Sequence, residues 1–363
     1  MRYLPAVLLI AFCAGCGLTP KAPRSAAQND AMDREIAALS VAVLKKERGA
    51  KRPVTRDVHA KAHGCVRATF TVSPGVPADY RAGVLSEPGR TYHAWVRFSN
   101  GSSEIRSDKK SDARGMAIKL MGVEGEKLLE SERNAQTQDF LLITHDAFFI
   151  KDGKDYLEFF KRLERGSNPA WFFFGRLPWR WTEFRAARQI VKRGGEVDNP
   201  LLAPYFSATP YQLGERNVVK YAVRPCEPAR LRARRADSPD YLRLAMMKSL
   251  EIREGAPACF QFMVQRRSEP ETMPVEDSRI PWDQEKSPFV PVATVSIPVQ
   301  EFTGEAHARW CEDLAFTPWH ALPAHRPLGN INRTRKVVYE AVSTFRREAN
   351  GAPLSEPAPE DGP

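Results

Sequence analysis

Hydrophobic and polar residues alternate one by one in the first part of the chain, which predicts β-strands there. In residues 65–72 every second residue is apolar, and residues 93–99 repeat the pattern. Residues 116–121 and 140–144 form two further short strands. Successive side chains of a strand point to opposite faces, so strands of this kind separated by turn residues predict an antiparallel sheet or barrel.

A helical pattern replaces the alternation in other parts of the chain. Apolar residues recur at helical spacing in residues 33–48, 154–164, 181–192 and 331–349, the last stretch being stopped by Asn350 and Gly351. Further strands are expected at residues 218–223, 259–266 and 292–299, and a helix after Ser238-Pro239. The order predicts one α+β domain over residues 33–349, built around an antiparallel β core.

The N-terminus has the features of an export signal. Arg2 gives a positive start, and Leu4–Ala14 is an apolar run too short to span a bilayer. Ala14-Gly15-Cys16 then resembles the lipobox of a bacterial lipoprotein, so we expect a signal at residues 1–16 and a tether at residues 17–32. An ordinary cleaved signal with two incidental cysteines is the alternative. In the first case the protein is exported to the bacterial cell envelope and held by lipid on Cys16 at a periplasm-facing surface, of the inner or the outer membrane.

The formal charge of the 363-residue chain is +10. The basic residues are spread along the sequence without a long Lys/Arg block, which disfavours nucleic-acid binding and leaves a buried anionic ligand as one destination for the charge. Residues 350–363 are rich in Pro, Glu and Asp, and we expect them to be disordered.

Four cysteines remain after the signal: Cys65, Cys226, Cys259 and Cys311. None lies in a CxxC pair, which argues against a zinc or iron–sulfur site. An exported protein can form disulfides, and four cysteines allow three pairings. The sequence does not choose among these pairings, and four unpaired buried thiols are the alternative.

Two clusters carry the chemistry of the chain. The first is residues 56–61, Arg-Asp-Val-His-Ala-Lys, directly ahead of the first alternating strand. The second lies in the last helix, where Arg335 is four residues before Tyr339 and therefore on the same helix face. A neighbouring cation favours the ionised phenol, and a phenolate is a ligand for ferric iron.

Here the sequence resembles the haem catalases, in particular their small bacterial catalase-like relatives. The resemblance runs from about Arg56 to Tyr339, with five segments in the order of the family. The segments are Arg56-x-x-His59-Ala-Lys, Val96-Arg97-Phe98-Ser99, Asp112-x-Arg114-Gly115-Met-Ala-Ile-Lys, Phe140–Asp146, and Leu314-Ala-Phe-x-Pro318 followed by Arg335-x-x-x-Tyr339. The resemblance implies a catalase-like antiparallel β-barrel core with surrounding helices, a C-terminal haem-ligand helix, and haem b as the cofactor.

The resemblance also implies the roles of the residues next to the iron. Tyr339 would be its axial ligand, kept ionised by Arg335. His59 would be the distal acid–base group, which takes a proton from the peroxide and returns it to the departing oxygen. Val58 would narrow the cavity over the iron.

The remaining implied roles concern the edges of the haem. Arg56, Arg97 and Arg335 would face its propionates, which gives part of the positive charge a buried destination. Ser99 would hydrogen-bond the ring of His59.

One position departs from the family pattern. Catalases pair the distal His with an Asn, whereas an ungapped match puts Thr137 there, beside Gln138; Asn134 reaches the position only with a shift. A Thr hydroxyl can bond a peroxide oxygen but offers no amide donor. The departure favours peroxidase turnover, or conversion of an organic or lipid hydroperoxide, over fast disproportionation of hydrogen peroxide.

Three functions follow from these observations. The chain is a catalase or peroxidase that consumes hydrogen peroxide, a haem enzyme of the allene-oxide-synthase kind that converts lipid hydroperoxides, or a non-catalytic haem-binding lipoprotein. The sequence ends soon after Tyr339, so the resemblance implies neither the NADPH site nor the tetramer contacts of larger catalases. We expect no NADPH, and a monomer or dimer.

Overall fold

The computed structural model describes residues 26–48, 53–168, 170–175, 177–226 and 236–363. The predicted signal, Cys16 and most of the predicted tether lie outside the described residues. In the described part of the chain, no helix is long and apolar enough to cross a membrane.

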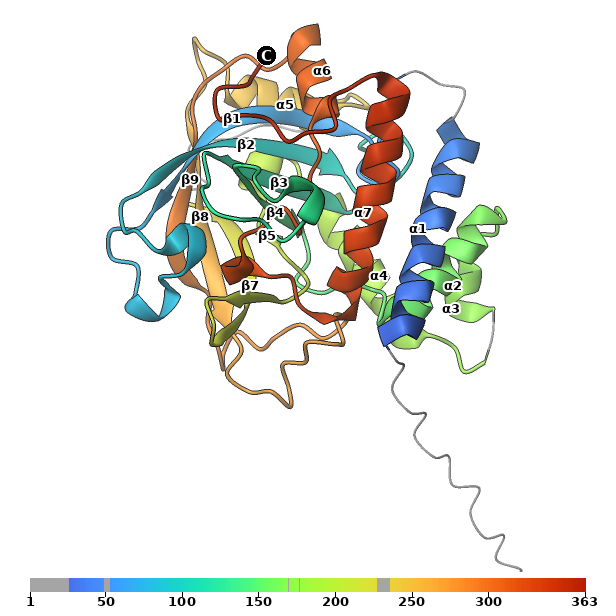
Figure 1. Ribbon diagram of the computed structural model, residues 1–363. Coiled ribbons are helices and arrows are strands. Elements are labelled where there is room, and N and C mark those ends of the chain that lie inside the picture. Colours follow the sequence, from blue (N-terminus) through green and yellow to red (C-terminus); the bar gives the residue numbers. More distant parts are fainter. Residues whose placement is uncertain (1–25, 49–52, 169, 176, 227–235) are drawn as a thin grey trace, which may run out of the picture.

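The centre of the molecule is an antiparallel β-barrel (Figure 1). Its strands are β1 (Ala62–Val72), β2 (Thr91–Asn100), β3 (Arg114–Met121), β4 (Thr137–Ile143), β5 (Tyr205–Phe206), β7 (Asn217–Pro225), β8 (Ala258–Arg266) and β9 (Val290–Ile297). They follow one another in the order β5-β4-β3-β2-β1-β9-β8-β7, and β5 pairs with β7 to close the barrel. The short β6 (Tyr211–Leu213) extends the sheet beyond β7. The predicted fold class, an antiparallel β-barrel with surrounding helices, is confirmed.

The alternation in the sequence sorts side chains between the inside and the outside of the barrel. In β1 the apolar set Val66, Ala68, Phe70 and Val72 is buried in the main core. The ring of Phe70 packs on those of other strands, among them Phe262 at 5.1 Å between ring centroids. Because the barrel is filled by side chains, a ligand site has to lie on its outer face.

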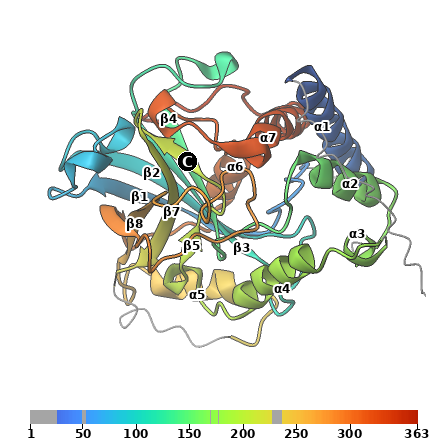
Figure 2. The same ribbon diagram turned by 90° about the horizontal axis from the view of Figure 1, so that it is seen from below.

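In the part of the chain that the structure describes, seven α-helices surround the barrel. They are α1 (Ala26–Arg48), α2 (Gly153–Glu164), α3 (Ala170–Phe174), α4 (Trp181–Gly195), α5 (Tyr241–Ser249), α6 (Glu305–Asp313) and α7 (Gly329–Asn350). Figures 1 and 2 show α1 and α7 side by side on one flank, with α2 against α1. The helix α1 begins at Ala26, inside the predicted tether, and its Asp33 accepts a hydrogen bond from Thr334 Oγ1 at 2.6 Å.

The C-terminal helix α7 ends at a left-handed Gly351, as Asn350-Gly351 predicts. The residues after it form no helix or strand, but they fold back over the barrel. The side chain of Glu356 is 1% exposed, and Arg67 on β1 donates to the Pro363 backbone at 3.3 Å. This tail, residues 352–363, therefore covers part of the outer face of β1 to β3.

Among the described residues, one disulfide, between Cys226 and Cys259, joins the end of β7 to β8. Cys65 on β1 and Cys311 on α6 are buried free thiols. Of the pairings left open by the sequence, this is the one present.

Candidate active site

His59 lies on the outer face of the barrel, in the loop ahead of β1. Its backbone is in the left-handed region, with φ of 58°. Its Nδ1 lies 3.0 Å from Ser99 Oγ on β2, and Ser99 pairs directly with Gly115 on β3. A Cβ on Gly115 would come within 2.6 Å of the imidazole, so the ring stands on a position that only glycine leaves open.

The surroundings of His59 keep its imidazole neutral. Burial is the main cause that lowers the pKa of His59 to about 4, and the charge of Arg97 is the second. The charge of Arg335 acts in the same direction. Arg97 also donates from Nη2 to the backbone oxygen of His59 at 2.9 Å. Because Nδ1 is engaged with Ser99, Nε2 is the ring nitrogen that can exchange a proton with a ligand.

Tyr339 and Arg335 meet on one face of α7, one turn apart. Arg335 Nη2 lies 3.3 Å from Tyr339 Oη, and the guanidinium is 5.2 Å from the phenol ring centroid. Arg335 Nη1 is fixed by Asn332 Oδ1 at 3.0 Å and Thr209 Oγ1 at 3.3 Å. Burial alone would lower the pKa of Arg335, but Tyr339 and its neighbours outweigh it and raise that pKa. A permanently charged donor therefore faces the phenol oxygen.

Three buried or half-buried arginines gather beside His59. Arg56 Nη1 pairs with Glu312 at 2.7 Å, and both Arg56 and Arg346 donate to the backbone oxygen of Leu314, at 2.6 and 3.1 Å. Arg97 is 3% exposed, and its Nε has no partner among the described residues. Arg346 was not predicted from the sequence.

The charges of these arginines are poorly balanced by the protein. Burial, followed by the charge of Arg56, lowers the pKa of Arg97 and lowers that of Arg346 to about 9. A lowered pKa means that keeping these two buried guanidinium groups charged costs free energy. A ligand carboxylate would offset this cost, so the cluster is suited to an anion.

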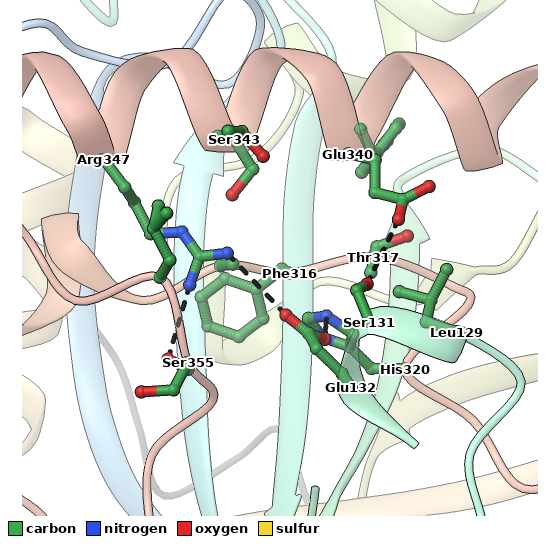
Figure 3. A pocket seen from close by; sticks show the side chains of 14 residues that line it. Leu129, Ser131, Glu132, Phe316, Thr317, His320, Glu340, Ser343, Arg347 and Ser355 are labelled. Atoms are coloured by element: carbon green, nitrogen blue, oxygen red, sulfur yellow. Dashed lines mark hydrogen bonds and ion pairs between the residues drawn. The ribbon is translucent and has the colours of Figure 1, made fainter.

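A cavity of about 380 Å³ runs along the face of α7 that carries Tyr339. Its other walls are the segments around Glu132 and Phe316 and the start of the tail. Figure 3 shows Arg347 and Ser343 on α7 above Phe316, with Glu132 and His320 at the far side. His59 does not line this cavity.

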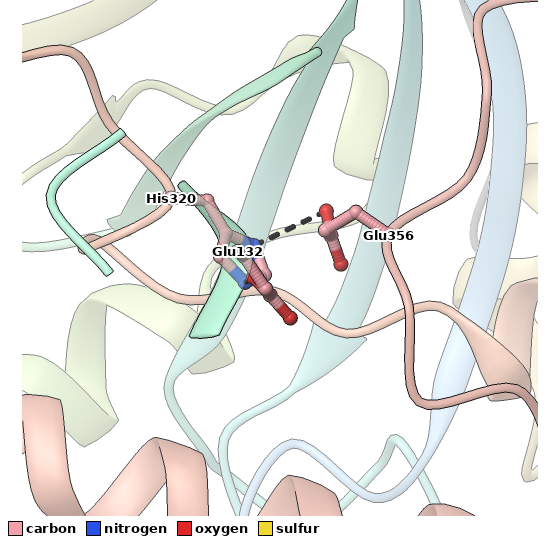
Figure 4. Close-up of side chains that lie close together, drawn as sticks. All are labelled: Glu132, His320 and Glu356. Atoms are coloured by element: carbon pink, nitrogen blue, oxygen red, sulfur yellow. Dashed lines mark ion pairs between the residues drawn. The ribbon is translucent and has the colours of Figure 1, made fainter. Parts of the chain in front are cut away.

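A buried cluster of charges closes one end of the cavity (Figure 4). His320 Nδ1 pairs with Asp139 at 2.8 Å and with Glu356 at 3.3 Å, and its Nε2 meets Glu132. Lys119 Nζ is 2.8 Å from Asp139 and also contacts Glu356.

The carboxylates of this cluster already have cations as partners. Glu132, His320 and Glu356 have the donor types of a metal site. Burial and the charge of Lys119 lower the pKa of His320. The charge of Glu356 acts in the opposite direction and helps to raise that pKa to about 9. A protonated His320 and a lysine ammonium take the place that a metal would have, so we assign the cluster a structural role.

Thr137 belongs to this cluster and does not lie beside His59. It pairs with Met121, whereas Gly115, under the His59 ring, pairs with Ile143. Ile143 lies six positions after Thr137, roughly 20 Å along β4. The Thr137 hydroxyl donates to Glu356 at 2.8 Å.

The other position considered for the distal Asn is Asn134, which is exposed in the turn before β4. Thr137 and Asn134 are the two candidates for the distal Asn position. In the structure neither side chain contacts the imidazole of His59.

The structure brings together most of the residues singled out in the sequence. His59, Ser99 and Arg97 are in contact, Arg56 joins the same arginine cluster, and the Arg335–Tyr339 pair forms. Val58, next to His59, is 40% exposed.

The sequence reasoning missed the roles of two residues. Arg346 follows Tyr339 by seven residues, two helical turns, and this spacing could have found it. Gly115 was part of a quoted segment, but its contact with His59 depends on the pairing of β2 with β3.

Comparison with known proteins relates this architecture to one family. The family model described as catalase matches residues 41–171, which include His59, Arg97 and Thr137 but not Tyr339. No curated protein sequence matches the chain.

Solved structures share the fold at low sequence identity. A fungal catalase is 18% identical with a TM-score of 0.61, covering 85% of this chain and 64% of its own. Catalase A from Saccharomyces cerevisiae is 17% identical with a TM-score of 0.60, covering 85% and 66%. A bacterial catalase is 18% identical with a TM-score of 0.59, covering 96% and 67%. The chain thus spans about two thirds of the length of these proteins.

Proposed function

From the premise that this is a catalase-like protein, with the catalase barrel and a catalase-family segment at residues 41–171, we propose that it binds haem b and decomposes peroxides. The observation that carries the proposal is the arrangement around Arg335. This guanidinium bonds the Tyr339 phenol on α7, and its charge also acts on His59 on the barrel. Arg335 thus connects the Tyr339 phenol on α7 with the His59 imidazole ahead of β1, two elements far apart in the sequence.

The donor set fits a haem on three counts. The phenol oxygen of Tyr339 is the kind of ligand that ferric iron takes, and the Arg335 guanidinium lies 3.3 Å from it. The arginine cluster of Arg56, Arg97 and Arg346 holds an excess of buried charge, including the partnerless Arg97 Nε, that matches two propionates.

The third count concerns the room around His59. Gly115 leaves room for the His59 ring against the barrel wall, and Ser99 Oγ contacts its Nδ1.

The roles of the residues follow from these contacts. Tyr339 Oη would hold the iron, and Arg335, 3.3 Å from this oxygen, would orient it. The arginine cluster holds the propionates and so fixes the orientation of the cofactor. Haem, when bound, supplies the iron at which the peroxide O–O bond is polarised.

His59 performs the proton transfer. With a pKa of about 4 it is neutral at the pH of most cellular compartments, so Nε2 accepts a proton from the bound peroxide. The same nitrogen then returns the proton to the departing oxygen. Ser99, bonded to Nδ1, keeps the ring in the orientation that both transfers need.

One observation favours a second candidate for the substrate. The Thr137 hydroxyl is engaged with Glu356, so His59 works without that hydroxyl as a second donor. A single acid–base group supports peroxidase turnover, or conversion of an organic hydroperoxide, better than rapid disproportionation of hydrogen peroxide.

Peroxide turnover by the full chain, supplied with haem during expression, tests the proposal. An oxygen electrode detects disproportionation, and product analysis with an organic hydroperoxide detects the second candidate. His59→Ala should retain haem and lose activity by about a hundredfold or more. His93→Ala, a substitution of an exposed histidine on β2, is the matched control and should keep full activity. Normal turnover by His59→Ala would refute the mechanism.

A further inference from the structure

The segment around α3 and the start of α4 exposes an unusual amount of apolar surface. The chain has seven tryptophans, and the three exposed ones lie between residues 171 and 181. Trp171, Trp179 and Trp181 are 59%, 49% and 48% exposed, and Leu177 between them is 75% exposed. We call these four residues the tryptophan face. A patch of this kind on a protein surface marks an interaction site.

Two members of the tryptophan face, Trp179 and Trp181, pack on phenylalanine rings. The ring of Phe174 contacts both Trp179 and Trp181, at 6.1 and 5.3 Å between centroids, and packs on Phe184 at 4.9 Å. The rings of Trp179 and Trp181 are 5.7 Å apart. Trp179 and Trp181 are therefore supported from below, although about half of each side chain stays in contact with solvent.

A basic stripe continues the tryptophan face along α4. Arg185, Arg188 and Lys192 are exposed and follow Trp181 at helical spacing, whereas the opposite side of α4 is buried. The one acidic residue within α4, Glu183, is buried and paired with Arg279 at 2.6 Å. The exposed side of this helix thus joins aromatic edges to positive charge.

This surface lies at the end of the molecule where the described chain begins. Figure 1 shows the first turn of α1 at the same end as α3 and α4, and Figure 2, seen from below, shows α3 and α4 on that side. Helix α2, which leads into α3, is tied to α1 by an ion pair of Lys161 with Glu35 at 2.7 Å. The sequence before Ala26 contains the apolar run Leu4–Ala14 and Cys16. A membrane attachment through this sequence would bring the tryptophan face to the bilayer.

We propose that the tryptophan face and the basic stripe of α4 form a docking surface for a bilayer that contains anionic phospholipid. Tryptophan rings are suited to the headgroup region, because one edge is apolar and the indole N–H is polar. Lysine and arginine near an anionic surface strengthen binding by about fivefold each. The exposed acid next to the stripe is Glu196, just after the helix end, 3.9 Å from Lys192. The rest of the exposed side of α4 combines aromatic edges with cations, which matches this partner better than a protein surface, where interface cores are depleted of lysine. The proposal does not depend on haem.

Fluorescence quenching on vesicles tests the docking surface in the full chain. The protein is added to phosphatidylcholine vesicles with or without phosphatidylglycerol. Each kind of vesicle is prepared once with brominated and once with unbrominated acyl chains. The ratio of tryptophan emission between brominated and unbrominated vesicles reports contact of indole with lipid, and flotation separately reports binding. We expect quenching on anionic vesicles, and its loss in Trp179→Ser/Trp181→Ser. Trp95 and Trp282, which are at most 5% exposed, should contribute little.

Charge variants and salt test the basic stripe. Arg185→Glu/Arg188→Glu/Lys192→Glu should weaken binding to anionic vesicles by about a hundredfold and remove the quenching. Leu244→Ser/Met247→Ser removes exposed apolar side chains from α5 and is the matched control, with no change expected. Raising the salt concentration should reduce quenching of the unmodified protein, a readout that needs no variant.

Three results would overturn the proposal. Unquenched tryptophans in protein that floats with the vesicles would mean that the tryptophan face does not touch lipid. Equal quenching on neutral vesicles that is insensitive to salt would exclude a role for the basic stripe. Self-association that Trp179→Ser/Trp181→Ser abolishes, without quenching by lipid, would identify a protein interface instead.

Discussion

At the scale of single residues, Gly115 decides where the imidazole of His59 can lie. A Cβ at this position would come within 2.6 Å of Cε1 and Nδ1 of His59 and 3.1 Å of Ser99 Oγ. We predict that Gly115→Ala displaces the ring and lowers peroxide turnover by at least about tenfold, because misplaced acid–base groups lose most of their effect. Haem content, read from the absorption spectrum, should not change. Gly75→Ala, where an added Cβ meets no atom within 4 Å, is the control; equal turnover in both variants would contradict the prediction.

The protonation of His59 predicts the pH dependence of activity. Burial, reinforced by Arg97, places its pKa at about 4, below the ordinary value of 6.5. Turnover should therefore stay level from about pH 8 to about pH 5 and fall only as the pH approaches 4.

Stability should follow the same group with a defined sign. Between pH 4 and 6.5 the unfolded state binds more protons at His59, so the contribution of this residue to the free energy of unfolding rises with pH across that window. Half-maximal activity near pH 6.5 in a rate profile of the haem-loaded protein would show that His59 titrates normally and contradict the assignment.

At the scale of elements, α7 is the helix that organises the site. Its residues Arg335, Tyr339 and Arg346 contribute a cation at the phenol, the phenol itself and a member of the arginine cluster. We predict that Arg346→Met weakens haem binding by roughly tenfold to a hundredfold, since a charge-assisted hydrogen bond to a carboxylate contributes about 1.5–3 kcal/mol. Affinity for haem dimethyl ester, which lacks the carboxylates, should be unchanged. A loss of equal size for both ligands, measured by spectral titration, would mean that Arg346 acts only through the fold.

The tail is a second element whose position depends on one buried contact. Glu356 meets Lys119 and Thr137 of the barrel and lies 3.3 Å from His320. We predict that Glu356→Gln lowers the free energy of unfolding by about 3 kcal/mol, because it leaves buried cations short of a carboxylate. Urea unfolding measures the change, and Glu360→Gln, an exposed position in the same tail, is the control.

The pH dependence of this loss has a defined direction. Burial lowers the pKa of His320, but the charge of Glu356 acts in the opposite direction. The resulting pKa is about 9, above the ordinary value of 6.5. The stabilisation from His320 is therefore complete below pH 6.5 and disappears as the pH rises through 9. The difference between Glu356→Gln and the unmodified protein should shrink over this range. A constant difference would show that His320 is not coupled to the tail.

At the scale of the whole molecule, the alternating pattern was sufficient to predict most of the barrel. The long strands β1, β2 and β8 have one face in the core, so the alternation reports their burial directly. The closure of the barrel was not predictable in this way. It depends on β5, whose two residues, Tyr205 and Phe206, pair with β4 and β7 and are too few to show a period.

The candidate site was predictable where its residues are neighbours in sequence or lie in the five catalase-like segments. Arg335 and Tyr339 form their pair because helical spacing alone sets it. Thr137 shows the limit of matching by sequence. A linear match counts residues along β4, whereas contact with His59 depends on the register between β3 and β4, which pairs Thr137 with Met121.

The absorption spectrum of the purified full chain, expressed with haem supplied, tests the central claim most directly. The account predicts a ferric haem spectrum of the phenolate-ligated type in the unmodified protein. Tyr339→Phe should lose the haem or shift its spectrum, whereas Tyr80→Phe, which changes a buried tyrosine of the main core, should not. A protein that takes up no haem, or a spectrum that Tyr339→Phe leaves unchanged, would contradict the assignment of Tyr339 as the iron ligand.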